Sequence, residues 1–221
     1  MVIVPCFLKN SIISTAHGKI RVNRLEIGDL VLSSNNKFVP VKFIGKRTLT
    51  KTAPKWEIEV EPIIVKQGAL GNGTPTRDLK VSPEHAFYID ELFYKAEELV
   101  NGDSIFRMGE TPENEIEYYH VDLGFHDLIF AEGAATESFG GAGRGHFDNC
   151  EEYYRLYGRE TAPYEPFAPS AYTSKNAIAK FGNLVGAKMP KVIHDLGAPL
   201  ARKVYAGAEK IEKRYVNGSD A

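Results

Sequence analysis

Cys6 and His85 are the two side chains of this sequence that could together supply a nucleophile and an acid–base group. Cys6 lies at the mouth of an apolar segment near the start of the chain. His85 follows Pro83, which fixes the backbone ahead of it, and precedes the apolar run 87–89, which we expect to be a buried strand. A thiol and an imidazole from two distant strands of one domain can form a catalytic pair. Taken singly, each residue also has a purely structural interpretation, as a small buried hydrophobe or a strand-edge histidine.

A second group of candidate residues consists of His120, Asp122 and His126. His120 and Asp122 share one face of a predicted strand, which invites a metal-binding interpretation. Two or three ligands without a clear fourth make a weak zinc site, and such side chains more often bind each other. A metal-dependent enzyme that uses these three residues is therefore kept as one alternative function.

The two cysteines, Cys6 and Cys150, are too few for a disulfide scaffold or a four-cysteine zinc site. Their number allows a single bridge between them. If Cys6 is a nucleophile it must be a free thiol when it acts, which favours a reducing compartment or action before export.

Composition excludes several other classes of protein. The chain has 221 residues, 43% of them hydrophobic, so it can bury one sizeable core. Its formal charge is −2 with acids and bases interspersed, so we expect no binding to nucleic acid or to an anionic membrane. No apolar run approaches the ~20 residues of a membrane span, and the start lacks the basic residues of a secretory signal. The localisation stays open between cytoplasmic and exported without a cleaved signal.

The sequence predicts many short strands, which must position these residues and are typical of a mostly β domain. A hairpin is expected around Ala16-His17-Gly18, with His17 a solvated turn residue. Pro40 should confine its strand to an edge or a bulge. A short helix is expected at 95–100. The other expected strands cover 30–32, 38–44, 57–61, 63–65, 116–123 and 126–131.

The strand pattern ends in a glycine-rich stretch that begins at Gly140. We therefore predict a β domain over 1–139, a Gly/Pro-rich linker over 140–173 and a helical C-terminal tail over 174–221. A short helix is expected at 151–157. The tail is interpreted as an appendage that packs on the domain or binds a protein partner.

An ordered series of short motifs resembles the bacterial Hedgehog/intein (Hint) domains. The resemblance spans about residues 6–139, roughly three fifths of the chain, and the order of the motifs is more specific than any one of them. The motifs are Cys6-Phe7-Leu8, Thr15–Val22, Leu25–Leu32, Val41–Gly45, Val81–Ala86, and Tyr118–Val121 through Gly133. The resemblance implies a pseudo-symmetric β domain that brings the first strand beside the late ones, with the partly helical appendage following it.

The resemblance also implies self-processing without a cofactor. Cys6 matches the cysteine that attacks the carbonyl before it and forms a thioester, and His85 matches the histidine that assists the amide nitrogen. Ser82 matches a hydroxyl residue, usually threonine, that hydrogen-bonds the strained peptide. Asp78 is a loose match to an aspartate base, although an ion pair with Arg77 or Lys80 is the more ordinary interpretation. The substrate would be the chain's own N-terminal flank, and the acceptor a small nucleophile or water.

The late part of the chain departs from the splicing pattern. His126 resembles the late histidine that transfers a proton in the second step, but 134–138 contain neither the histidine nor the asparagine that full splicing requires. Any reaction should therefore stop at the thioester and pass to a nucleophile. The acyl group would be that of Pro5, whose ring crowds the sulfur. The alternative from another class is a non-catalytic binding or structural module with the same fold.

Overall fold

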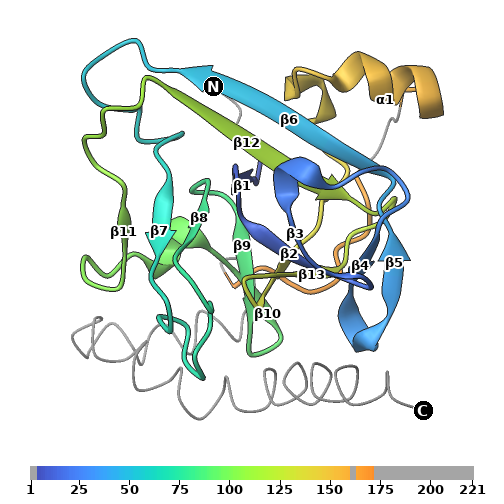
Figure 1. Cartoon of the computed structure of the whole chain (residues 1–221), viewed down its shortest axis with the longest axis horizontal. Helices are drawn as coiled ribbons and strands as arrows, with labels where there is room; N and C mark the ends of the chain where they lie inside the picture. The colour runs from blue at the N-terminus through green and yellow to red at the C-terminus, as the bar shows by residue number, and fades with distance from the viewer. Residues whose placement is uncertain (1–3, 160–162, 172–221) are drawn as a thin grey trace.

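Two β-sheets form the body of the protein in a computed structural model that describes residues 4–159 and 163–171 (Figure 1). The first sheet has the order β11 (Ile105–Arg107), β7 (Ile63–Val65), β8 (Leu79–Val81), β1 (Phe7–Leu8), β12 (Glu115–Asp122), β6 (Phe43–Thr50). The second has the order β10 (Leu92–Lys95), β9 (Ala86–Ile89), β14 (Ala134–Glu137), β13 (Leu128–Ala131), β2 (Ile12–Thr15), β4 (Leu30–Leu32), β5 (Phe38–Pro40), with β3 (Gly18–Arg21) paired to β2. The mostly β prediction is confirmed.

Helical structure in the described residues is limited to short pieces. The 3-10 turns are η1 (Val22–Arg24), η2 (Ser34–Asn36), η3 (Ala96–Leu99) and η4 (Arg144–His146), and the α-helix is α1 (Cys150–Tyr157). None of the described helices is long and apolar enough to cross a membrane. The predicted helix at 151–157 is confirmed as α1, and the one at 95–100 is the 3-10 turn η3.

The pairing of β1 brings distant parts of the chain together. Phe7 pairs antiparallel with Val81 on one side and with Tyr119 on the other. If this register is continued back by one residue, Cys6 lies opposite Ser82, just after β8, and opposite His120 in β12. The two-residue strand β1 thus positions the start of the chain between the middle and the end of the domain.

The long antiparallel pair β6–β12 runs along one side of the molecule (Figure 1). Its register extends from Thr50 opposite Glu115 to Phe43 opposite Asp122. The main apolar core draws on strands of both sheets and contains Phe7, Ile13, Val31, Phe87 and Ile129 among others. Burial of these apolar side chains is the main stabilising contribution to such a domain.

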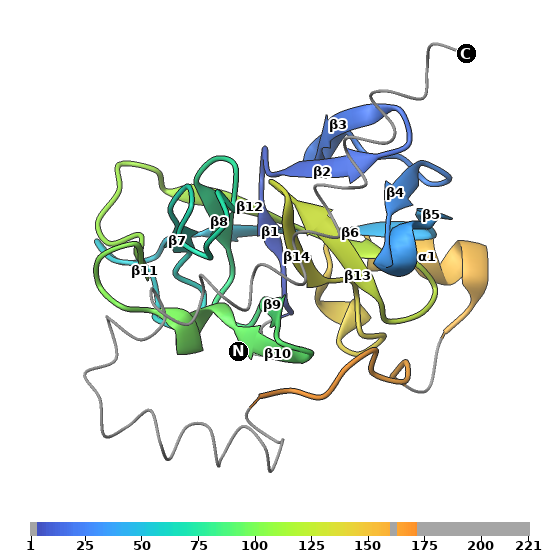
Figure 2. The same cartoon turned by 90° about the horizontal axis from the view of Figure 1, so that it is seen from below.

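The segment after residue 139 packs against the sheets where it is described. Phe147 lies so close to β6 that a Cβ added to Gly45 would meet its ring at 2.4 Å. The Asn149 side chain accepts from the amide of Lys46 at 2.9 Å and donates to the Ile44 carbonyl at 3.0 Å. Further on, Ser170 forms a parallel bridge to Phe93 in β10, beside which residues 163–171 run in Figure 2. The predicted linker therefore contains α1, the boundary at 139 stays a prediction, and the predicted tail 174–221 lies outside the described residues.

Several local predictions can be compared with the strands. The hairpin of β2 and β3 is confirmed, with His17 exposed at its turn. The prediction of a strand at 57–61 is wrong. The Glu57 carbonyl accepts from the amides of Val60 and Glu61, so the segment forms a turn, and Ile58 is 59% exposed. The strand predicted at 38–44 is divided, because the chain leaves β5 at Pro40 and enters the other sheet at Phe43. β5 is an edge strand, as Pro40 requires.

Candidate active site around Cys6

Ser82 forms two hydrogen bonds with the backbone of Cys6. The Cys6 amide donates to the Ser82 hydroxyl oxygen at 2.8 Å, and the Ser82 amide donates to the Cys6 carbonyl at 2.9 Å. The Ser82 hydroxyl also donates to the Val4 carbonyl at 3.4 Å. The peptide nitrogen between Pro5 and Cys6 is therefore held by a buried hydroxyl group that comes from mid-chain.

His85 is attached to the same turn. Its amide donates to the Ser82 carbonyl at 3.1 Å, and its fully buried ring packs on Phe7 with the centroids 4.2 Å apart. Neither ring nitrogen has a hydrogen-bond partner among the described residues. Burial lowers the pKa of His85 well below its usual value, and the neighbouring His120 lowers it further. The imidazole is therefore neutral at pH 7, and a proton taken up by the ring would be held only weakly.

His120 joins this group from β12. Its ring meets that of His85 edge to face at 5.7 Å between centroids and that of Phe139, also edge to face, at 5.4 Å. Burial lowers the pKa of His120 to about 3. The sequence suggested His120 only as a metal ligand. Its place opposite Cys6 depends on the β1–β12 pairing, which no local pattern announces.

The Cys6 thiol lies in an apolar cluster. Only 1% of the residue is exposed, and the other buried members of its cluster are Val4, Trp56, Val60, Ile116, Tyr118, Phe139 and Phe147. Burial raises the pKa of the thiol far above its usual value, so the resting group is protonated. Cys6 and Cys150 are both free cysteines, without a bridge between them.

His126 and Glu137 form a second polar group beside the first. His126 Nε2 lies 3.6 Å from Glu137 Oε2, and the two side chains are 9% and 13% exposed. The other Glu137 oxygen accepts from the amide of Ala86, the residue after His85, at 2.7 Å. Sequence analysis did not name Glu137 as a candidate residue. It compared 134–138 only with the histidine and asparagine that splicing requires.

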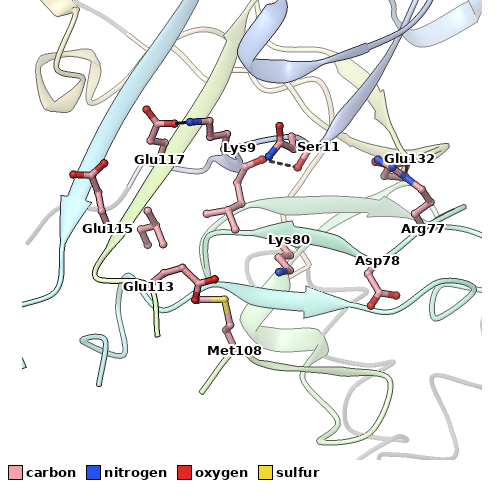
Figure 3. Close-up of a pocket in the computed structure, with 13 residues that line it drawn as sticks. Lys9, Ser11, Arg77, Asp78, Lys80, Met108, Glu113, Glu115, Glu117 and Glu132 are labelled. Carbon is pink, nitrogen blue, oxygen red and sulfur yellow. Dashed lines mark hydrogen bonds and ion pairs between the residues drawn. The ribbon is translucent and has the colours of Figure 1, made fainter. Parts of the chain in front are cut away.

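Asp78 lies apart from these groups. Its carboxylate accepts from Lys66 Nζ and from the Gln67 amide, both at 3.0 Å, and these contacts lower its pKa. It lines a surface groove of about 580 Å³, together with the Arg77–Glu132 ion pair, whose atoms lie 2.6 Å apart (Figure 3). Cys6 is not among the lining residues. The expected ion pair exists, but its partner is Lys66 rather than Arg77 or Lys80.

The metal-binding interpretation has no support in the described part of the chain. Asp122 Oδ2 pairs with Arg144 Nη2 at 2.6 Å, and Asp122 Oδ1 accepts from the Gly124 amide at 2.7 Å. No three His, Cys, Asp or Glu side chains within residues 4–159 and 163–171 are grouped so that they could hold a metal ion. The carboxylate that would have been a ligand is instead half of a buried ion pair.

Comparisons with known proteins add a family match and a set of similar folds. The family model of the Hint domain matches residues 5–142. No curated protein matches the chain. Among solved structures, the gp41-1 intein is 17% identical, with 60% of this chain and 97% of that chain covered and a TM-score of 0.40. The bacterial intein-like domain from Clostridium thermocellum is 16% identical over 61% of this chain and 97% of that chain, with a TM-score of 0.43. A DnaB intein from Synechocystis is 17% identical over 61% and 98%, with a TM-score of 0.39.

Proposed function

The chain belongs to the Hint domain family, and we propose that it is a self-processing domain whose Cys6 converts the Pro5–Cys6 peptide bond into a thioester. The family match confirms the resemblance, and the two sheets confirm the mostly β domain that it implied. The observation that carries the proposal is the 2.8 Å hydrogen bond from the Cys6 amide to Ser82, in the turn that also holds His85.

Ser82 acts on the leaving nitrogen in this proposal. When sulfur attacks the Pro5 carbonyl and the C–N bond breaks, the nitrogen becomes an amine and needs a proton. The Ser82 hydroxyl oxygen, 2.8 Å away, fixes the direction of the N–H bond before the reaction. Its second contact, at 3.4 Å to the Val4 carbonyl, restrains the Val4–Pro5 peptide, which directly precedes the scissile bond. The amide is thus oriented before the attack.

His85 is the proton carrier. Because the buried ring is neutral and no described group occupies its nitrogens, it can take the proton of the Cys6 thiol and pass it to the departing amine. The S–H and C–N bonds break, the S–C and N–H bonds form, and the net charge of the site is unchanged. His120, in contact with His85, keeps a charged imidazole unfavourable and so favours rapid return of the proton.

The buried thiol makes this first step slow. An ionised sulfur in an apolar cluster is strongly disfavoured, so little thiolate is present before the reaction. The attack therefore depends on transfer of the thiol proton to His85. The family's splicing reaction does not follow, because the last strand of the domain contains no asparagine that could cyclise. The acyl group therefore leaves to water or to an added nucleophile.

A reporter protein fused upstream of residue 1 tests the proposal. Dithiothreitol or hydroxylamine should release the reporter with the mass expected for cleavage after Pro5, and Cys6→Ala should abolish the release. The burial of the thiol favours one alternative, a Hint-fold module that binds a partner without reacting. Equal amounts of fragment from the two proteins would show that cleavage does not depend on the Cys6 thiol and would end the self-processing proposal.

A further inference from the structure

Tyr164, in the described segment 163–171, packs against the apolar cluster that contains Cys6. Its ring meets the Phe139 ring edge to face, with centroids 6.4 Å apart and an interplanar angle of 90°. Phe139 is a buried member of that cluster and also contacts His120. Cys6 and Phe139 are each 1% exposed, whereas Tyr164 is only half-buried. Tyr164 therefore belongs to the outer layer of the cluster around the thiol.

The Tyr164 hydroxyl is bound to the buried ion pair of Asp122 and Arg144. It donates to Asp122 Oδ1 at 3.3 Å and accepts from Arg144 Nη2 at 3.1 Å. The Tyr164 amide donates to the Gly140 carbonyl at 3.0 Å. The ring thus packs on apolar side chains while the hydroxyl and the amide are both bonded, which gives the side chain a defined position.

The backbone after Gly140 connects Tyr164 with the acyl side of the scissile bond. A Cβ added to Gly141 would lie 2.6 Å from the Tyr164 backbone nitrogen, and a Cβ added to Gly143 would lie 3.3 Å from Val4 Cγ2. Tyr164 and Val4 therefore pack on the same short stretch of backbone. Since Val4 is followed by the proline whose carbonyl would form the thioester, Tyr164 is near the group that an acceptor must reach.

We propose that Tyr164 determines by size which nucleophiles reach the Cys6 thioester, so that the segment 163–171, here called the cover, admits small acceptors and excludes bulky ones. The inference rests on the proposed function, because it concerns the acceptor that resolves the thioester. The acceptor class that it assigns is water and compact thiols or amines. An acceptor as large as a tripeptide thiol has to displace Tyr164 first.

The rest of the cover is attached to β10 and to His126. The Phe93 amide in β10 donates to the Pro169 carbonyl at 3.0 Å, and the Phe167 amide donates to His126 Nδ1 at 3.2 Å. Figure 2 shows the cover passing beside β10. Because the cover is bonded to the domain at several separate points, opening it costs free energy, and a bulky acceptor has to supply or await that opening.

The acceptor step is thioester exchange, and its atoms balance. The sulfur of the added thiol bonds to the Pro5 carbonyl carbon, and the bond from that carbon to the Cys6 sulfur breaks. The proton of the added thiol passes to the Cys6 sulfur. The upstream segment leaves as the thioester of the added thiol, Cys6 becomes a thiol again, and no oxidant or cofactor takes part.

The test compares two thiols on the full chain with an upstream reporter. Mercaptoethanol is the small acceptor and glutathione the bulky one, and the measured quantity is the ratio of the release rate with glutathione to the rate with mercaptoethanol. In Tyr164→Ala, which removes the ring, we expect this ratio to rise about tenfold, because the cover no longer has to open. Tyr164→Phe keeps the ring and loses the hydroxyl contacts, and should raise the ratio about twofold to threefold. A change in folding or in thioester formation alters both rates and leaves the ratio unchanged.

Gly141 supplies a variant outside the cover. Gly141→Ala brings a Cβ against the Tyr164 backbone nitrogen and must displace the cover, so it should also raise the ratio, by about threefold to tenfold. Gly140→Ala is the matched control, because a Cβ there meets nothing within 4 Å. Tyr157→Ala removes a tyrosine ring of α1 that lies outside the Cys6 cluster. Both controls should keep the ratio of the unaltered chain.

The outcomes separate this inference from the function on which it rests. A ratio that stays unchanged in Tyr164→Ala, or that rises equally in Tyr157→Ala, would overturn the inference and leave thioester formation intact. Absence of thiol-driven release from the unaltered chain would overturn the proposed function and the inference together.

Discussion

The imidazole rings of His85 and His120 meet edge to face with centroids 5.7 Å apart, although 35 positions separate the residues in the sequence. Both side chains are at most 1% exposed. Two neutral rings are compatible with this contact, but a proton on either would place a cation in an apolar interior. The site should therefore depend on pH through these two groups.

The first prediction is a loss of stability in acid. Both pKa values are lowered by folding, so the stabilisation is complete above the unfolded value of about 6.5 and is lost as pH falls below it. For His120 the loss should continue to about pH 3. Each histidine should reduce the free energy of unfolding by up to about 1.4 kcal/mol per pH unit. Urea unfolding at pH 7.5, 5.5 and 4.5 measures this dependence.

His120→Asn provides the comparison, since it removes one of the two groups. Its acid dependence over the same pH range should be about half that of the unaltered protein. His17→Asn, at an exposed turn, should keep the full dependence. The same slope in His120→Asn and in the unaltered protein would show that His120 does not remain neutral on folding.

The second prediction concerns Ser82. In Ser82→Ala the buried Cys6 amide loses its side-chain acceptor, which should lower the free energy of unfolding by about 1–3 kcal/mol. If the same bond orients the scissile amide, thiol-driven release of an upstream reporter should slow by about tenfold to a hundredfold. Ser82→Thr keeps the hydroxyl group and should retain most of the stability and most of the rate of reporter release. The idea fails if Ser82→Ala releases the reporter as fast as Ser82→Thr.

Two features of this site were predicted from the sequence, one from neighbouring residues and one from the order of the motifs. Pro83 and the apolar run after it indicated that His85 precedes a strand, and β9 begins at Ala86. The motif order indicated that Cys6 and Ser82 would meet. The prediction for His85 depends on turn chemistry and on alternation of apolar residues, which can be read from short windows of sequence. The prediction for Cys6 and Ser82, which are 76 positions apart, came instead from the resemblance of the motif series to the Hint domains.

The partners contributed by pairing of distant strands could not be predicted in this way. His120 lies opposite Cys6 only because β1 pairs with β12, more than 100 positions later. Glu137 contacts Ala86 through the pairing of β14 with β9. The turn at Glu57–Glu61 was mistaken for a strand because alternation alone does not reveal whether Ile58 has anything to pack against. Register and packing are properties of the whole fold.

The third prediction tests the buried ion pair between Asp122 and Arg144. Their side chains are 3% and 4% exposed, and the Arg144 guanidinium also lies 3.8 Å from the Tyr153 ring centroid. Arg144→Met should lower the free energy of unfolding by about 3–5 kcal/mol, because it leaves a carboxylate buried without its cation.

The double variant Asp122→Asn with Arg144→Met should recover a large part of that loss, since no charge remains buried. Arg155→Met, the same change at an exposed position of α1, should stay within about 0.5 kcal/mol of the unaltered protein. Thermal or urea unfolding of the four proteins checks these values. If the double variant were as unstable as Arg144→Met, loss of packing rather than unpaired charge would explain the effect.

The last prediction concerns the close approach of Phe147 to β6, which joins the segment after residue 139 to the domain. A Cβ at Gly45 would lie 2.4 Å from the Phe147 ring, so Gly45→Ala should force the ring away and cost about 1–3 kcal/mol. Gly140→Ala is the matched control, because a Cβ there meets nothing within 4 Å. In a Phe147→Ala background the clash is absent, so Gly45→Ala should cost little. Urea unfolding of the single and double variants gives the coupling energy, and additive effects would mean that the two residues do not contact each other. Since Phe147 also belongs to the cluster around Cys6, Gly45→Ala should in addition increase the rate at which a thiol reagent modifies Cys6.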